Sequence, residues 1–273
     1  MVYDIIVFGG QSNMQGQSDK LSENEEVRGA FEYKMLTDSY EPLRNPVGED
    51  IKYDGTGGYR YYDHIDAAKW LEDHALGSAC YGHTNLVPEF CRAYIKETGR
   101  GAAAVHAAKG STEIECWMKG SRGYEFIVKK TKSAVKALAK IKDASAGDVY
   151  FIWLQGESDA IFSKAREDYL KKLLVLDGDL RKDIGLSKFG IIEVGRFTND
   201  RRDDEIINAQ KDAAELYPDR FLMLTESAGT MGNEPDMMHP LIGGHFSAKG
   251  LERLGREAGT KLGEFVKLNT SGK

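Results

Sequence analysis

The first candidate for chemistry in this chain is a serine near the amino terminus. Ser12 stands in the segment Gly10-Gln11-Ser12-Asn13-Met14-Gln15-Gly16, directly after the apolar run from Tyr3 to Phe8. An apolar run that ends at glycines is typical of a buried strand, so Ser12 is expected just beyond the strand's carboxyl end. Ligands of open α/β sheets bind outside those carboxyl ends. Ser12 is therefore a candidate nucleophile.

A serine hydroxyl is a weak nucleophile unless other groups assist it. It needs a base, normally a histidine oriented by a carboxylate, and hydrogen-bond donors for the negative charge that develops on the substrate oxygen. Gly110 and Gln155 each follow a further strand-like run. A glycine lets its backbone N–H approach a reacting oxygen closely, and a glutamine amide can donate to the same oxygen. Together with the Ser12 N–H, these groups are the candidate oxyanion donors.

Two histidines near the carboxyl end compete for the role of base. His245 comes shortly before Ser247, a candidate N-cap for a helix that starts at Ala248, so His245 is expected on the turn that leads into this helix. His239 closes an Asp-x-x-His arrangement that begins at Asp236, but the residues after it are a poor helix start. We favour His245 as the base and keep His239 as the alternative.

These residues must be positioned by a framework of alternating strands and helices. Apolar runs predict buried strands at 3–8, 101–107, 149–154, 189–194 and 221–224. Helical spacing of apolar residues predicts helices at 87–98, 124–141, 169–184, 203–216 and 248–266. Such alternation is typical of parallel strands joined by right-handed crossovers. We predict an α/β protein, a three-layer α/β/α sandwich with a central, mostly parallel five-stranded sheet of the flavodoxin-like kind.

One stretch interrupts this alternation. From about 37 to 84 the chain is polar and rich in glycine and aromatic residues, above all between Tyr53 and His64. Long connections in compact domains are often binding loops, and tyrosine faces pack well on sugars. The insertion is either a source of substrate contacts or a solvent-facing loop without a ligand. Because no linker or repeat divides the chain, we predict a single domain over residues 1–273.

Composition narrows the classes of partner. The net charge of -6 argues against non-specific binding to nucleic acid, and a carbohydrate or another small molecule is the better candidate. The three cysteines lack metal-type spacing, so we expect buried thiols and neither disulfides nor a metal site. Since no long apolar run and no leader-like start are visible, we expect a cytoplasmic protein without membrane contact. The sequence carries no signal of oligomeric state.

Together, the chemistry-bearing segments resemble the SGNH-hydrolase superfamily, and within it the branch of sialate O-acetylesterase-like proteins and carbohydrate esterase family six. Gly10 to Met14 is similar to that branch's nucleophile block, Gly110 to its second-block glycine, 155–159 (Gln-Gly-Glu-Ser-Asp) to its third block, and His245 to Gly255 to the block of its catalytic histidine. The resemblance implies an α/β/α fold and a serine esterase that removes acetyl groups from sugars of sialate or xylan type. It also implies an acyl-enzyme and no metal or other cofactor.

The chain departs from this family at the acid. The family's acid lies three residues before its histidine, where this chain has Ile242. Asp236 is then the expected orienting carboxylate, and a Ser–His dyad supported by a backbone carbonyl is the other possibility. Gln11 and Glu157 are expected to brace the loops around the site. Because the acid is missing, a non-catalytic glycan-binding protein on the same fold stays an alternative, as does an esterase for a non-carbohydrate acyl ester.

Overall fold

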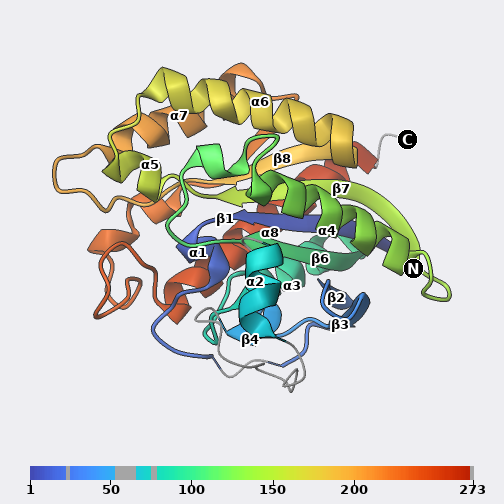
Figure 1. The fold of residues 1–273 in the computed structure, drawn as a ribbon. Helices are drawn as coiled ribbons and strands as arrows, with labels where there is room; N and C mark the ends of the chain where they lie inside the picture. The colour runs from blue at the N-terminus through green and yellow to red at the C-terminus, as the bar shows by residue number, and fades with distance from the viewer. Residues whose placement is uncertain (23–24, 53–65, 75–78, 271–273) are drawn as a thin grey trace.

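The fold is built on a seven-stranded sheet with the order β3-β2-β6-β1-β7-β8-β9 (Figure 1). The structure is a computed structural model that describes residues 1–22, 25–52, 66–74 and 79–270. The strands are β1 (Val2–Gly10), β2 (Ala30–Lys34), β3 (Ser39–Pro42), β6 (Gly101–Ala108), β7 (Ser145–Leu154), β8 (Leu186–Ile192) and β9 (Phe221–Thr225). Neighbouring strands run parallel except β2 and β3, which are antiparallel. The predicted α/β class with a mostly parallel sheet is confirmed.

The predicted count of five strands was too low. All five predicted strands are present and form the contiguous part β6-β1-β7-β8-β9, and β2 and β3 extend the sheet at one edge. These two were missed because neither has an apolar run: β2 reads Ala-Phe-Glu-Tyr-Lys and β3 reads Ser-Tyr-Glu-Pro. β3 is the edge strand and is partly exposed, so it needs no continuous apolar sequence. β2 is an inner strand, and its buried polar residues Glu32 and Lys34 form an ion pair at 2.8 Å, so it too departs from the apolar pattern.

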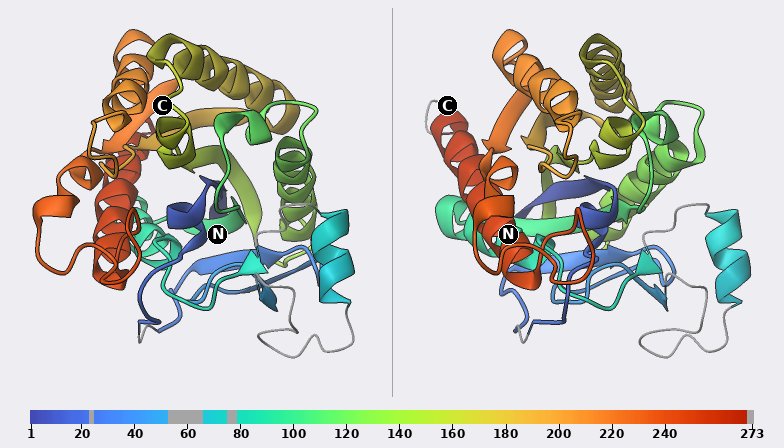
Figure 2. Two further views of the ribbon diagram at one scale, coloured as in Figure 1. Left: turned by 60° about the vertical axis from the view of Figure 1, so that its left-hand side comes forward. Right: turned by 90° about the vertical axis from the view of Figure 1, so that its left-hand side faces the viewer.

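Helices cover both faces of the sheet, as Figure 2 shows. On one face lie α3 (Val87–Thr98) and α8 (Ala248–Thr270), and on the other lie α4 (Arg122–Leu138), α6 (Arg166–Ile184) and α7 (Asp203–Leu216). Residues of β1 alternate between the two cores: Ile5 and Val7 belong to the core under α4, α6 and α7, whereas Ile6 and Phe8 belong to the core under α3 and α8. Burial on both faces explains why the strand is apolar throughout.

Two glycines allow α8 to lie directly on α3. A Cβ atom at Gly255 would come within 2.3 Å of the Leu86 carbonyl oxygen, and one at Gly259 within 2.1 Å of the Phe90 carbonyl oxygen. Any larger residue would push the two helices apart. The start of α8, and with it the histidine segment that precedes it, is therefore held close to the sheet.

The insertion carries secondary structure of its own. It contains β4 (Glu49–Lys52), α2 (Ala67–Asp73) and β5 (Ala79–Cys80), and β4 pairs with β5 in parallel. Glu49 joins this unit to α4 through a fully buried ion pair with Lys130, 2.7 Å between Oε1 and Nζ. The tyrosine-rich run from Tyr53 to His64 lies outside the described residues. In the part of the chain that the structure describes, no helix is both long and apolar enough to span a bilayer.

Candidate active site

Ser12 is the first residue of α1 (Ser12–Gln15), the short helix toward which β1 points (Figure 1). Gly10 makes the turn with a φ of 146°, and a Cβ there would lie 2.0 Å from the Leu154 carbonyl oxygen, so the position requires glycine. N–H groups in the first turn of a helix have no intrahelical acceptor, which leaves the Ser12 N–H free for a ligand. Ser12 is 6 % exposed, and no described side-chain hydrogen bond engages its hydroxyl.

Gly110 lies against Ser12, as the sequence predicted. A Cβ built on Gly110 would be 3.4 Å from Cβ of Ser12, so the two residues are in van der Waals reach. The Gly110 N–H is already engaged, because it donates to Oε1 of Gln15 at 3.0 Å. This N–H can therefore serve a substrate oxygen only when the Gln15 side chain releases it.

The Gln155 amide is used inside the protein, which speaks against its expected role as an oxyanion donor. Its side chain is fully buried, and Nε2 donates to the Thr112 carbonyl at 2.8 Å and to Oδ2 of Asp159 at 2.5 Å. Both amide hydrogens are thus used inside the protein, and Oε1 accepts from the Tyr169 hydroxyl at 2.9 Å. Gln155 ties the loop after β6 to the loop after β7 instead.

Gln11 and Asn13 connect α1, the helix that begins at Ser12, to its surroundings. Gln11 accepts the Ser158 N–H at 3.2 Å, at the start of α5 (Glu157–Ile161), which fits its expected bracing role. Asn13 does more than the sequence suggested. Its Nδ2 donates to Oε1 of Glu157 at 2.7 Å and to the Gly244 carbonyl at 3.0 Å, and its Oδ1 accepts the Phe246 N–H at 3.1 Å. Since Gly244 and Phe246 flank His245, Asn13 brings the histidine segment to α1.

Both candidate histidines lie on this segment, opposite each other in a short antiparallel pair. Met238 and Phe246 form an isolated bridge, and the His239 N–H donates to the His245 carbonyl at 2.8 Å. The proximity of Ser12 and the histidine segment thus arises from residues more than two hundred positions apart. The order of the elements along the chain places both at the carboxyl ends of the strands, and Asn13 provides the contact.

The hydrogen bonds of the two imidazoles distinguish their proton states. Nδ1 of His245 lies 3.1 Å from the Gly243 carbonyl, which only accepts, so Nδ1 carries the proton and Nε2 keeps a free lone pair. Nδ1 of His239 accepts the N–H groups of Leu241 and Ile242 at 3.1 and 3.0 Å, so the proton of a neutral His239 is on Nε2. His245 is therefore in the tautomer that a base needs, and His239 is not.

Asp236 does not orient either ring, which corrects its expected role. Its side chain is 81 % exposed and lies 3.8 Å from Nζ of Lys249, and within the described residues no hydrogen bond joins it to His239 or His245. The main-chain carbonyl of Asp236 instead accepts from Ser247 Oγ at 2.5 Å. The group that orients His245 is the Gly243 carbonyl, so the geometry fits the dyad supported by a backbone carbonyl.

Glu157 is a buried carboxylic acid behind the site. It is 5 % exposed, and its Oε2 has no hydrogen-bond partner. Burial raises the pKa of Glu157 to about 7, the Asn13 hydrogen bond opposes this shift, and the carboxylates of Asp159 and Asp203 add to it. The folded protein thus holds this proton at a pH where an unfolded chain has released it.

Stability should therefore fall as the pH rises through this range. Between the ordinary glutamate pKa and about 7 the native state binds one more proton than the unfolded state, so unfolding becomes easier with increasing pH. Between pH ~5 and ~8, we expect the wild type to lose about 2 kcal/mol of unfolding free energy relative to Glu157→Gln, which cannot titrate. Urea unfolding of both proteins at the two pH values measures this difference. Parallel pH dependence in the two proteins would contradict it.

A cluster of three carboxylates is paired with a lysine. Glu113, Glu115 and Asp159 are the one group in the described ranges whose ligand atoms lie close enough to share a cation. Nζ of Lys164 lies within 3.4, 2.5 and 3.4 Å of these three carboxylates, respectively. The ammonium group takes the place that a cation would occupy.

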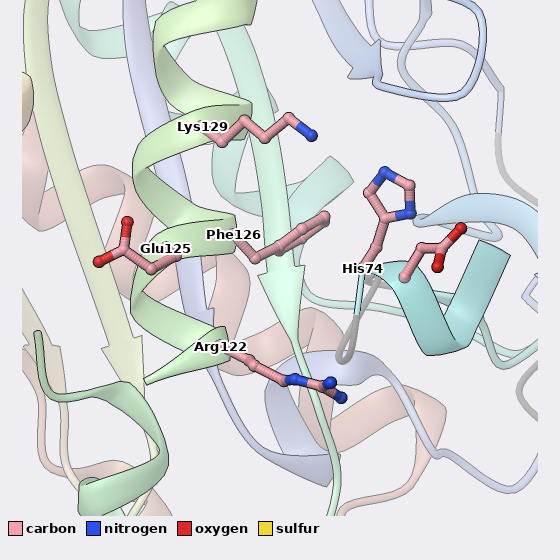
Figure 3. Close-up of a pocket in the computed structure, with 6 residues that line it drawn as sticks. His74, Arg122, Glu125, Phe126 and Lys129 are labelled. Atoms are coloured by element: carbon pink, nitrogen blue, oxygen red, sulfur yellow. The ribbon is translucent and has the colours of Figure 1, made fainter. Parts of the chain in front are cut away.

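A cavity of about 140 Å³ lies between α2 and the first half of α4 (Figure 3). It is lined by Asp73, His74, Arg122, Glu125, Phe126 and Lys129. In Figure 3, Arg122, Phe126 and Lys129 extend from α4 toward His74, whereas Glu125 points away from it. The His74 ring stacks on Trp70 at 4.3 Å and meets Phe126 edge-on at 6.4 Å. Because α4 follows β6 and begins at Arg122, the Arg122 end of the cavity lies toward the carboxyl ends of the strands.

The mostly parallel sheet with helices on both faces, and with Ser12 just beyond the carboxyl end of β1, fits the class of SGNH-type hydrolases. The chain belongs to the family of carbohydrate esterases described as sialic acid-specific acetylesterases, whose model matches residues 2–262. The family resemblance stated from the sequence is thereby confirmed. This membership supports an esterase of the carbohydrate acetylesterase type.

Individual relatives agree with the family assignment. The chain is 25% identical to the probable carbohydrate esterase At4g34215 of Arabidopsis thaliana over 209 residues, which is 76% of this chain and 74% of that protein. The X-ray structure of the At4g34215 protein matches with a TM-score of 0.63 at 20% identity and covers 95% of this chain and 97% of that one. A carbohydrate acetylesterase from Xanthomonas citri shares the fold with a TM-score of 0.50 at 15% identity, over 93% of this chain and 54% of that chain. A lipase/acylhydrolase from Enterococcus faecalis also shares the fold, with a TM-score of 0.50 at 13% identity over 96% of each chain.

Proposed function

We propose that this protein is a serine esterase that removes acetyl groups from O-acetylated carbohydrate through an acyl-enzyme. One observation carries the proposal: Asn13 holds the main chain on both sides of His245 beside the Ser12 helix, and His245 is in the tautomer with a free Nε2 lone pair. With Ser12 and His245 on adjoining segments, proton transfer from the hydroxyl to Nε2 is the step that would activate the serine. The family description supplies the acetyl ester of a sugar as the substrate class.

In the proposed reaction, Nε2 of His245 takes the hydroxyl proton as Oγ of Ser12 attacks the acetyl carbonyl carbon. The Ser12 N–H stabilises the negative carbonyl oxygen, and the Gly110 N–H joins it when Gln15 turns away. The tetrahedral intermediate then breaks its bond to the sugar oxygen, which receives the proton from His245. Water attacks the acetyl-serine with His245 again as base, and acetate leaves with Ser12 restored.

The direct test is acetate release from acetylated substrates. We expect the wild-type protein to release acetate from O-acetylated sialic acid or acetylated xylan, and from p-nitrophenyl acetate as a small reporter. Release from the reporter alone would indicate an esterase for another acyl ester. Release from none of them would contradict the proposal.

A glycan-binding protein without catalysis is the second candidate. It is favoured by Ile242 at the position of the family's acid and by the internal hydrogen bonds of the Gly110 and Gln155 donors. A fluorophosphonate separates the two candidates, because it labels a serine only when a base activates it. Labelling of Ser12 supports the esterase, and glycan binding without labelling supports the binding protein.

The cavity between α2 and α4 is the candidate contact for the sugar part of the substrate. Arg122→Ala combined with Lys129→Ala should raise KM for an acetylated glycan at least about tenfold, because even one hydrogen bond from a charged group contributes roughly 1.5–3 kcal/mol. KM for p-nitrophenyl acetate should stay within about twofold, since this ester has no sugar to reach the cavity. Steady-state kinetics on both substrates measures the difference.

Lys136→Ala is the matched control for this pair. Lys136 is an exposed lysine of α4 that does not line the cavity, so its loss changes the helix charge without touching the cavity. Equal KM increases for both substrates, or for the control, would show that the cavity does not bind the glycan.

A further inference from the structure

The Asn13 side chain uses both of its N–H donors and its carbonyl oxygen, and two of these three hydrogen bonds go to the histidine segment. An asparagine amide has two N–H donors and one carbonyl acceptor. The donors go to Glu157 and to the Gly244 carbonyl, and the acceptor takes the Phe246 N–H. Asn13 is 1 % exposed, so these bonds are protected from competition with water.

The segment that Asn13 holds has little stiffness of its own. Gly243 and Gly244 are adjacent, and Gly244 has a φ of 76°, in the region that favours glycine. Glycines have the largest backbone freedom of all residues. The Gly243 carbonyl is also the group that orients Nδ1 of His245. The orientation of the imidazole therefore depends on main chain that is held by the short pair with Met238 and His239 on one side and by Asn13 on the other.

Glu157 holds Asn13 in turn. Its Oε1 accepts from Nδ2 of Asn13 at 2.7 Å, and this bond determines which way round the amide lies. If the amide were flipped, its oxygen would face both the Glu157 carboxylate and the Gly244 carbonyl, and its NH₂ would face the Phe246 N–H. The free Oε2 of Glu157 and the nearby carboxylates of Asp159 in α5 and Asp203 in α7 show that Glu157 occupies an unfavourable place for a charge. Such a cost is typical of residues with a functional task.

We propose that Asn13 and Glu157 are positioning residues for the base. Through the Gly244 carbonyl and the Phe246 N–H they hold the Gly243–Phe246 main chain, and the Gly243 carbonyl then orients His245 where the family uses an acid. The inference rests on the proposed esterase function. The base is thus supported by Asn13, the residue next to Ser12, rather than by a carboxylate next to the histidine.

The test compares removal and conservative replacement. Asn13→Ala should lower kcat for p-nitrophenyl acetate, and the rate of Ser12 labelling by a fluorophosphonate, by the same factor of about 10–100, with KM within about twofold. Glu157→Ala should lower both rates about tenfold. Glu157→Gln should restore them to within about threefold of wild type at neutral pH, because its amide oxygen still accepts from Asn13. A purely structural role would not give this rescue.

Asp177→Asn is the control for loss of stability. Asp177 is a fully buried carboxylate that pairs with Arg181 and Arg220, away from the site, so its replacement weakens the fold without touching the base. Its kcat should match wild type well below the melting temperature. If Asn13→Ala does not fold, the two Glu157 variants decide alone. Unchanged kcat in Asn13→Ala, or no rescue by Glu157→Gln, would overturn the inference, whereas an active Ser12→Ala would overturn the proposed function itself.

Discussion

Ser12→Ala is expected to lower the turnover of acetyl esters by about 10⁴-fold or more, which is the typical effect of removing an enzyme nucleophile. The acyl-enzyme cannot form without Oγ, and what remains is catalysis by the N–H donors and by substrate binding. Acetate release and p-nitrophenol release both measure the loss. Equal rates in the variant and the wild type would end the esterase proposal.

The fold of this variant should be unaffected, so the loss can be assigned to chemistry. The Ser12 hydroxyl has no hydrogen-bond partner among the described side chains, and its removal should change the unfolding free energy by no more than about 0.5 kcal/mol. Ser158→Ala is a matched control, because Ser158 is also 6 % exposed and also lies in the first turn of a helix that follows the carboxyl end of a strand. Its activity should stay within about threefold of wild type. A similar loss in both variants would point to a general effect of losing a serine hydroxyl.

The sequence predicts the framework well because burial leaves a strong pattern. The predicted helices at 87–98 and 203–216 match α3 and α7 to the residue, and β1 is recognisable because both of its faces are covered. In a parallel sheet the carboxyl ends of all strands lie on the same side, so Ser12 and Gly110 could be placed together from the order of the elements alone. The edge strand β3 left no such pattern, because one of its sides is not paired.

The details of the site could not be predicted because they depend on hydrogen bonds between distant residues. Gln155 follows a strand as expected, yet its amide is drawn inward by the Thr112 carbonyl and by Asp159. Asp236 has the right spacing to His239, yet its side chain lies in solvent beside Lys249. Spacing along the chain constrains the position of Cα atoms, whereas the direction of a side chain depends on which partners the fold brings near it. The role of Asn13 was missed for the same reason.

The two histidine variants should differ sharply. His245→Ala is expected to lower kcat by about 10³–10⁴-fold and to suppress fluorophosphonate labelling of Ser12, because the base that activates the hydroxyl is gone. His239→Ala should lower kcat by no more than about tenfold. Its ring caps the N–H groups of Leu241 and Ile242, so its loss loosens the histidine segment without removing the base. Steady-state hydrolysis of p-nitrophenyl acetate by both variants measures the contrast.

Asp236→Asn, measured in the same experiment, tests whether the site is a Ser–His dyad or a triad that includes Asp236. An acid that orients a catalytic histidine contributes a factor of about 10⁴ to turnover, so its loss would be as visible as the loss of the base. Asp236 is exposed and lies beside Lys249, so its replacement should change kcat less than about twofold. If His239→Ala and Asp236→Asn were the inactive variants while His245→Ala kept its activity, the Asp-x-x-His arrangement would be the catalytic one. The tautomers argue against that outcome, because Nδ1 of His239 already accepts two backbone N–H groups and has no proton to donate to a carboxylate.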